Sequence, residues 1–92
     1  MAALEEWGVV DETLIVVTAD HGESLTEHGY LFDHGDHLYD VSLRVPLIFR
    51  WPGTVQADAK LSCLVSNQDI TPTMLSLLDI PDEHERQGRD LS

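Results

Sequence analysis

The chain has 92 residues, enough for one small domain, and its 17 acidic and 5 basic residues give a net charge of −12. This charge excludes nucleic acid as a natural partner, because no basic patch could release counterions from phosphates, whereas a metal cation suits such a surface. The hydrophobic fraction of 42% argues against disorder, and no apolar run reaches transmembrane length. The acidic first residues do not resemble a signal peptide.

The first half of the chain predicts a helix end, a strand and a long loop. Residues 2–7 predict the end of a helix that Gly8 terminates. Residues 13–18 are almost wholly apolar rather than alternating, which indicates a strand covered on both faces, as in a parallel sheet. Residues 22–36 are polar and rich in histidine, and loops of this length are usually functional or disordered. One helical turn is expected at residues 38–43.

The second half predicts two more strands and a helix. Residues 45–49 form a second continuous apolar run that ends at a Trp-Pro-Gly turn signal. Residues 61–65 predict a short third strand. Asp69 is expected to be the N-cap of a helix that has Pro72 in its first turn and includes residues 72–78. The polar residues 79–92 are expected to form a tail over the surface.

This order of elements is typical of an α/β protein with a mostly parallel sheet. The strands lack enough neighbours and covering helices, so apolar faces and sheet edges would stay open. The chain is therefore predicted to be the C-terminal part of a larger domain. By itself it should be poorly stable or self-associate, and its net charge should oppose association at low salt.

Asp20 and His21 directly follow the first strand, at the end where open α/β sheets place catalytic groups. A carboxylate and an imidazole together suit Zn²⁺, Mn²⁺ or, less often, Ca²⁺. Gly22 would permit the turn that brings both side chains onto one ion. Two protein ligands do not complete a site, so further ligands must come from elsewhere. The alternative is that Asp20 caps a nearby helix.

Three further histidines, His28, His34 and His37, follow in the long loop. Two of them lie in acid-His-Gly triplets, at residues 27–29 and 33–35. A histidine beside a carboxylate can stay protonated to bind an oxyanion, or act as a general acid. Each one alone is better explained as a solvated loop side chain, but their number favours a functional role for the set.

In its ordered series of motifs the chain resembles the C-terminal portion of a sulfatase of the alkaline-phosphatase superfamily. Each motif alone is a weak signal, but the set covers nearly the whole chain in the order of the family. The matching segments are 13–22 (TLIVVTADHG), 23–29 (ESLTEHG), 38–49 (LYDVSLRVPLIF), 51–53 (WPG), 69–75 (DITPTML) and 87–91 (QGRDL). The resemblance implies an α/β/α sandwich with a mostly parallel sheet, of which residues 1–92 form a partial domain.

The resemblance also implies roles for the site residues. Asp20 and His21 would complete a divalent-metal site, usually of calcium, with manganese or zinc as alternatives. His34 would contact the sulfate and stabilise its charge, with His37 as the rival for that catalytic position, and His28 would contribute to substrate binding. The expected substrate of the full-length enzyme is a small sulfate ester or a sulfated glycan.

The chain departs from the family because two of the family's motifs are missing. The Cys/Ser-x-Pro-x-Arg motif, whose first residue becomes the formylglycine nucleophile, and an upstream Asp-Asp pair are both absent from the 92 residues. Cys63 lies outside any such motif and is expected to be a buried apolar residue. The nucleophile is therefore expected in a missing N-terminal part, and the chain alone is expected to be inactive.

Two alternatives remain open at this point. The first is a phosphotransferase or phosphodiesterase of the same superfamily, which would use a lone threonine as nucleophile. The match over 38–49, followed by the Trp-Pro-Gly turn, favours the sulfatase. The second alternative is a catalytically inactive, truncated metal-binding remnant.

Overall fold

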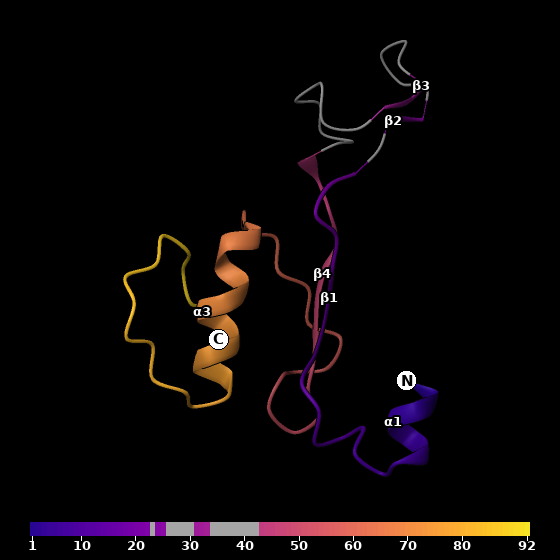
Figure 1. Cartoon of the computed structure of the whole chain (residues 1–92), viewed down its shortest axis with the longest axis vertical. Helices are drawn as coiled ribbons and strands as arrows, with labels where there is room; N and C mark the ends of the chain where they lie inside the picture. The colour runs from indigo at the N-terminus through magenta and orange to yellow at the C-terminus, as the bar shows by residue number, and fades with distance from the viewer. Residues whose placement is uncertain (23, 26–30, 34–42) are drawn as a thin grey trace. The chain divides into compact units, whose positions relative to one another are not determined.

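The computed structural model describes residues 1–22, 24–25, 31–33 and 43–92. These residues fall into two compact units, Met1–Ala57 and Asp58–Ser92. Among the described residues, no helix is both long and apolar enough to cross a membrane. Figure 1 shows the following elements in chain order: α1 (Ala2–Glu6), β1 (Ile15–Thr18), β2 (Ser24–Leu25), β3 (Leu31–Asp33), β4 (Leu47–Arg50), the 3₁₀ helix η2 (Asn67–Asp69) and α3 (Ile70–Leu77).

The two apolar runs form neighbouring strands, as predicted. β1 and β4 pair along their length and lie side by side in Figure 1, with Val17 opposite Ile48. The pair is antiparallel, however, and a parallel sheet is not seen within the part of the chain that the structure describes. An uninterrupted apolar run indicates that a strand needs cover on both faces, but it does not indicate the direction of the neighbouring strand. Only the path of the intervening chain determines that direction.

A second, shorter strand pair lies inside the segment predicted as a loop. β2 and β3 pair antiparallel, with Ser24 opposite Asp33, and the ladder is irregular. So short a pair leaves no periodic signal in a sequence, since strands are recognised over four or more residues. The helical turn expected at 38–43 lies almost wholly outside the described residues.

The N-terminal helix ends where the sequence predicts. Gly8 adopts a φ of +71° after the C-cap Trp7. The Gly8 and Val9 amides donate to the carbonyls of Glu5 and Leu4, which is the Schellman arrangement that satisfies the last helical carbonyls.

The guanidinium of Arg50 connects the end of β4 to the turn that follows the helix. Its Nη1 donates to the carbonyl of Val10 at 3.0 Å, and its Nη2 donates to Asp11 Oδ1 at 3.2 Å. These contacts hold the turn against the end of the strand pair.

The helix of the second unit is confirmed, but its capping differs from the prediction. α3 begins directly after Asp69, which occupies its N-cap position as predicted, and η2 extends the helical path back to residue 67. Ser66 is the N-cap of η2 and forms a capping box with Asp69, in which the Asp69 carboxylate accepts from the Ser66 amide. Asp69 precedes α3 without capping it through its side chain.

The prediction of a third strand at 61–65 is wrong. The structure assigns no strand there, and Leu64 is 90% exposed. Cys63 is also exposed, not buried. A short apolar run becomes a strand only when another strand completes its hydrogen bonds, and no pairing occurs over these residues.

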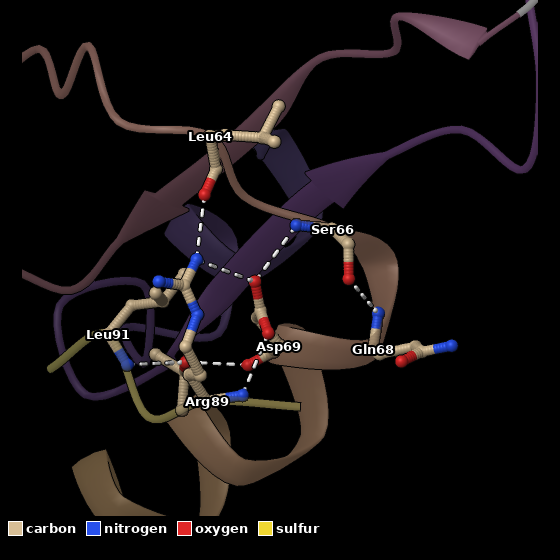
Figure 2. A network of polar contacts seen from close by, with 7 residues as sticks. Leu64, Ser66, Gln68, Asp69, Arg89 and Leu91 are labelled. Carbon is tan, nitrogen blue, oxygen red and sulfur yellow. Dashed lines mark hydrogen bonds and ion pairs between the residues drawn. The ribbon is translucent and has the colours of Figure 1, made fainter. Parts of the chain in front are cut away.

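The buried Asp69 carboxylate joins α3 to the C-terminal tail (Figure 2). Asp69 is 4% exposed. Its Oδ1 accepts from the Arg89 amide at 2.7 Å, and its Oδ2 accepts from the Ser66 amide at 2.9 Å. The Thr73 hydroxyl donates to the Asp69 carbonyl and accepts from the Leu91 amide at 3.0 Å. The polar tail is therefore anchored on α3, and we call this set of contacts the Asp69 network.

Arg89 extends the Asp69 network to the segment before η2. Its Nη2 donates to the carbonyl of Leu64 at 2.7 Å and lies 3.8 Å from Asp69 Oδ2. Every buried side-chain nitrogen or oxygen among the described residues has a hydrogen-bond partner. A fully satisfied network of this kind fixes the geometry of its members, because each lost partner would leave a buried polar group unpaired.

The hydrogen bonds hold the pKa of Asp69 below its ordinary value of 3.8. The Arg89 amide contributes most, followed by the Ser66 amide, and the Arg89 charge adds to them. Burial acts in the opposite direction, since it disfavours the charged form, but the donors outweigh it. The network therefore favours the ionised carboxylate.

We predict that acid weakens the attachment of the tail. Because the folded pKa of Asp69 lies below the unfolded value of about 3.9, its contribution is complete above about pH 4 and is lost as the pH falls through the lowered pKa. The amide resonance of Arg89, followed by NMR across a pH series, should titrate with an inflection below 3.8. Asp69→Asn should abolish that titration, and the surface change Glu83→Gln should leave it intact. An inflection at or above 3.8 would contradict the expectation.

We predict that Gly88→Ala detaches the tail. A Cβ at Gly88 would collide with the carbonyl of Gln68 and lie 2.9 Å from the Asp69 nitrogen. Since these are backbone atoms, relief requires a main-chain shift that costs about 1–3 kcal/mol. Hydrogen exchange at the Leu91 amide measures the free energy that is needed to open the tail away from α3. Gln87→Ala, next to it, is the control and should leave exchange unchanged; equal exchange in the two variants would refute the close approach.

Candidate functional site

Asp20 and His21 lie just beyond the paired end of β1. The last residue of β1, Thr18, is opposite Leu47, the first residue of β4. The apolar run ends there, so the next residues leave the ladder and are not constrained to alternate between faces. The sequence predicted this position for the pair.

The two side chains turn toward one another. Asp20 Oδ1 accepts from the His21 backbone amide at 2.9 Å, and Asp20 Oδ2 lies 3.6 Å from His21 Nε2. His21 Nδ1 is 2.9 Å from the Gly22 carbonyl. A carbonyl can only accept, so this hydrogen bond requires the proton on Nδ1, and in the neutral ring Nε2 then carries the lone pair. A carboxylate oxygen and an imidazole nitrogen are thereby held close together.

The pair lies at the surface. The Asp20 side chain is 88% exposed and that of His21 is 39% exposed. An exposed carboxylate keeps most of its hydration and remains accessible to an ion from solvent. With a protonated imidazole the two groups form a surface ion pair, which contributes little to stability. With a neutral imidazole they present two electron-pair donors to a cation.

Within residues 1–22, 24–25, 31–33 and 43–92, no three histidine, cysteine or acidic side chains gather as a metal site would require. Asp20 and His21 are thus two donors without a third from the described part of the chain. The hydrogen bond that Asp20 accepts comes from the backbone of its neighbour. The alternative prediction, that Asp20 caps a helix, finds no support in that contact.

The three loop histidines, His28, His34 and His37, lie outside the described residues. Their roles as sulfate-contacting and substrate-binding groups therefore stay predictions. The sequence did not predict one group of the candidate site, namely the Gly22 carbonyl that orients the His21 ring. A main-chain acceptor leaves no signal in a residue pattern, since every residue has one.

Comparison with known proteins gives close relatives over almost the whole chain. Arylsulfatase K of Bos taurus is 37% identical over 89 residues, which are 97% of this chain and 16% of that protein. N-acetylglucosamine-6-O-sulfatase of Bacteroides thetaiotaomicron is 38% identical over 88 residues, 96% of this chain and 15% of that protein. The extracellular sulfatase SULF-1 homolog of Drosophila melanogaster is 35% identical over 88 residues, 96% of this chain and 8% of that protein.

The chain spans about one-sixth of the length of the first two relatives. No solved structure gives a significant match. The family model named Sulfatase matches residues 1–80. That match, together with the relatives, shows that the chain belongs to the sulfatase family, whose fold is an alkaline-phosphatase-like α/β fold.

Proposed function

We propose that this chain is a segment of a metal-dependent sulfuric-ester hydrolase, to which Asp20 and His21 contribute two metal ligands. The observation that supports the proposal is the 3.6 Å separation of Asp20 Oδ2 and His21 Nε2 just past the end of β1. Family membership supplies the reaction class, because the relatives named above are sulfatases.

The residues fit a divalent ion in three respects. Donors 3.6 Å apart can both bind one ion at the usual distances of about 2.0–2.6 Å. The contact of His21 Nδ1 with the Gly22 carbonyl resembles the support that metal-binding histidines commonly have. The exposure of Asp20 leaves room for further ligands. Calcium is the ion that the family resemblance favours, while the imidazole nitrogen suits manganese or zinc.

The loop histidines supply the remaining chemistry in this proposal. A divalent ion held at the site would polarise a sulfate oxygen. His34, or His37 in its place, would donate to the sulfate or to the leaving oxygen, where negative charge develops. His28 would bind the substrate nearby. The formylglycine nucleophile would belong to a part of the enzyme that these 92 residues do not contain.

Two alternatives concern the reaction of the whole enzyme and the state of the isolated chain. A phosphotransferase or phosphodiesterase would use similar ligands, but the family model and the relatives are sulfatases. An inactive metal-binding remnant fits the isolated chain better, because the described part holds no three-ligand group and the sequence holds no nucleophile motif. We therefore propose activity for the assembled enzyme and none for the chain alone.

We predict weak metal binding by the isolated chain. Two side-chain ligands and water should give a Kd of about 10⁻³ M or weaker for Ca²⁺. Titration calorimetry with Ca²⁺, Mn²⁺ and Zn²⁺ measures it, and Asp20→Ala should abolish the binding. Glu12→Gln is the matched control, because it removes one exposed acidic charge from the same unit. Tight binding that survives Asp20→Ala would show that other residues are the ligands.

We predict no turnover of an aryl sulfate by the chain alone, since metal and histidines cannot replace a covalent nucleophile. Activity of the assembled enzyme is tested with a chimera in which this chain replaces the matching segment of the Bacteroides sulfatase. Hydrolysis by the chimera should fall about 100-fold or more with Asp20→Ala, because metal stabilisation of the transition state contributes several kcal/mol. His34→Ala should have a comparable effect. Hydrolysis by the isolated chain, above blank and lost in His34→Ala, would refute the proposal.

A further inference from the structure

One face of the β1–β4 pair carries apolar side chains that nothing in the described part of its unit buries. Residues directly opposite in an antiparallel pair share a face. Ile15, Val17, Ile48 and Arg50 therefore share one face, which we call the Val17 face. Val17 is 48% exposed and its cross-strand neighbour Ile48 is 55% exposed. The most exposed pair on this face is thus apolar.

The opposite face is apolar as well. It carries Val16 and Phe49, which are opposite each other and half-buried. A two-stranded surface ribbon normally turns one polar face to water. No hydrophobic residue in the described part of the chain is buried. The strand pair therefore has apolar side chains on both faces and only partial cover.

The strand edges point to the same conclusion. Among the described residues, β1 and β4 form a sheet of two strands, so the outer edge of β4 has no ladder partner there. Such edges accept another strand, and an isolated two-stranded ribbon is at best marginally stable. A partner for this surface would offer both a strand and apolar side chains.

Length and charge identify that partner. The chain matches only 16% and 15% of the first two relatives, so about five-sixths of a sulfatase lies outside the matched segment. A second copy would instead place two chains of net charge −12 against each other. Like charges of this size oppose association, most strongly at low salt. The remaining part of a sulfatase domain fits the surface better than a second copy does.

We infer that the Val17 face is an interface that binds the remaining part of a sulfatase domain, even when that part is supplied as a separate polypeptide. This inference rests on the proposed function for the identity of the partner. The partner places a strand against a free edge of the pair and apolar side chains over Val17 and Ile48. Binding excludes water from both side chains.

The test is co-expression of the tagged 92-residue chain with the part of the Bacteroides sulfatase that lies outside its matched segment. The two polypeptides should co-purify as a one-to-one complex. The double change Val17→Thr/Ile48→Thr keeps β-branched side chains but places hydroxyls on the face, and it should weaken association at least tenfold. Val9→Thr is the matched control, because it makes the same change at a partly exposed valine outside the strand pair. The control should not affect association.

Hydrogen exchange of the unmodified chain tests the inference even if the variants fail to fold. In the complex, amides of β1 and β4 should exchange at least tenfold more slowly than in the free chain, while those of α1 should change little. Absence of a complex, equal loss with Val9→Thr, or a homodimer in sedimentation that the partner does not displace would each overturn the inference. None of these measurements needs metal or turnover. If the two polypeptides associate but the chain does not bind metal, only the ligand roles of the proposed function are contradicted. If the chain binds metal but the polypeptides do not associate, only this inference is contradicted.

Discussion

The constraint that governs the rest of the structure is the incomplete burial of the apolar side chains of the β1–β4 pair. The β1–β4 pair carries hydrophobic side chains on both faces, yet the described part of the chain buries none of its hydrophobic residues. Burial of apolar surface is the main driving force of folding, so strands of this composition are stable only as part of a larger sheet. The matched segment is about one-sixth of the first two relatives, which is consistent with a division of one hydrophobic core between this chain and the rest of a sulfatase domain.

Where apolar packing is thin, polar contacts determine the local geometry. In the second unit, the buried Asp69 carboxylate accepts from the amides of Ser66 and Arg89 and so fixes both the start of the helix and the path of the tail. In the first unit, Arg50 does the same between the strand end and the turn near Val10. The contacts of Asp69 with Arg89 and of Arg50 with Val10 join residues that are far apart in the sequence. They orient segments whose hydrophobic side chains remain exposed.

The candidate metal ligands depend on the same strand pair. Asp20 and His21 leave the ladder immediately after Thr18, and the pairing with Leu47 sets where that point lies. The Gly22 carbonyl then orients the imidazole toward the carboxylate. A metal site at these two donors would need further ligands from outside the described residues.

The sequence alone determined the composition-driven features: the family motifs, the two strands, the helix after residue 69 and the position of Asp20 and His21. These follow from local apolar runs, turn signals and residue chemistry. Only the tertiary structure decided the antiparallel direction of β1 and β4, the exposure of Cys63, and the role of the Asp69 carboxylate as anchor of the tail in addition to its part in the capping box. Each of these depends on contacts between residues far apart in the chain, such as Asp69 with Arg89, and a local pattern does not encode which distant group supplies the partner.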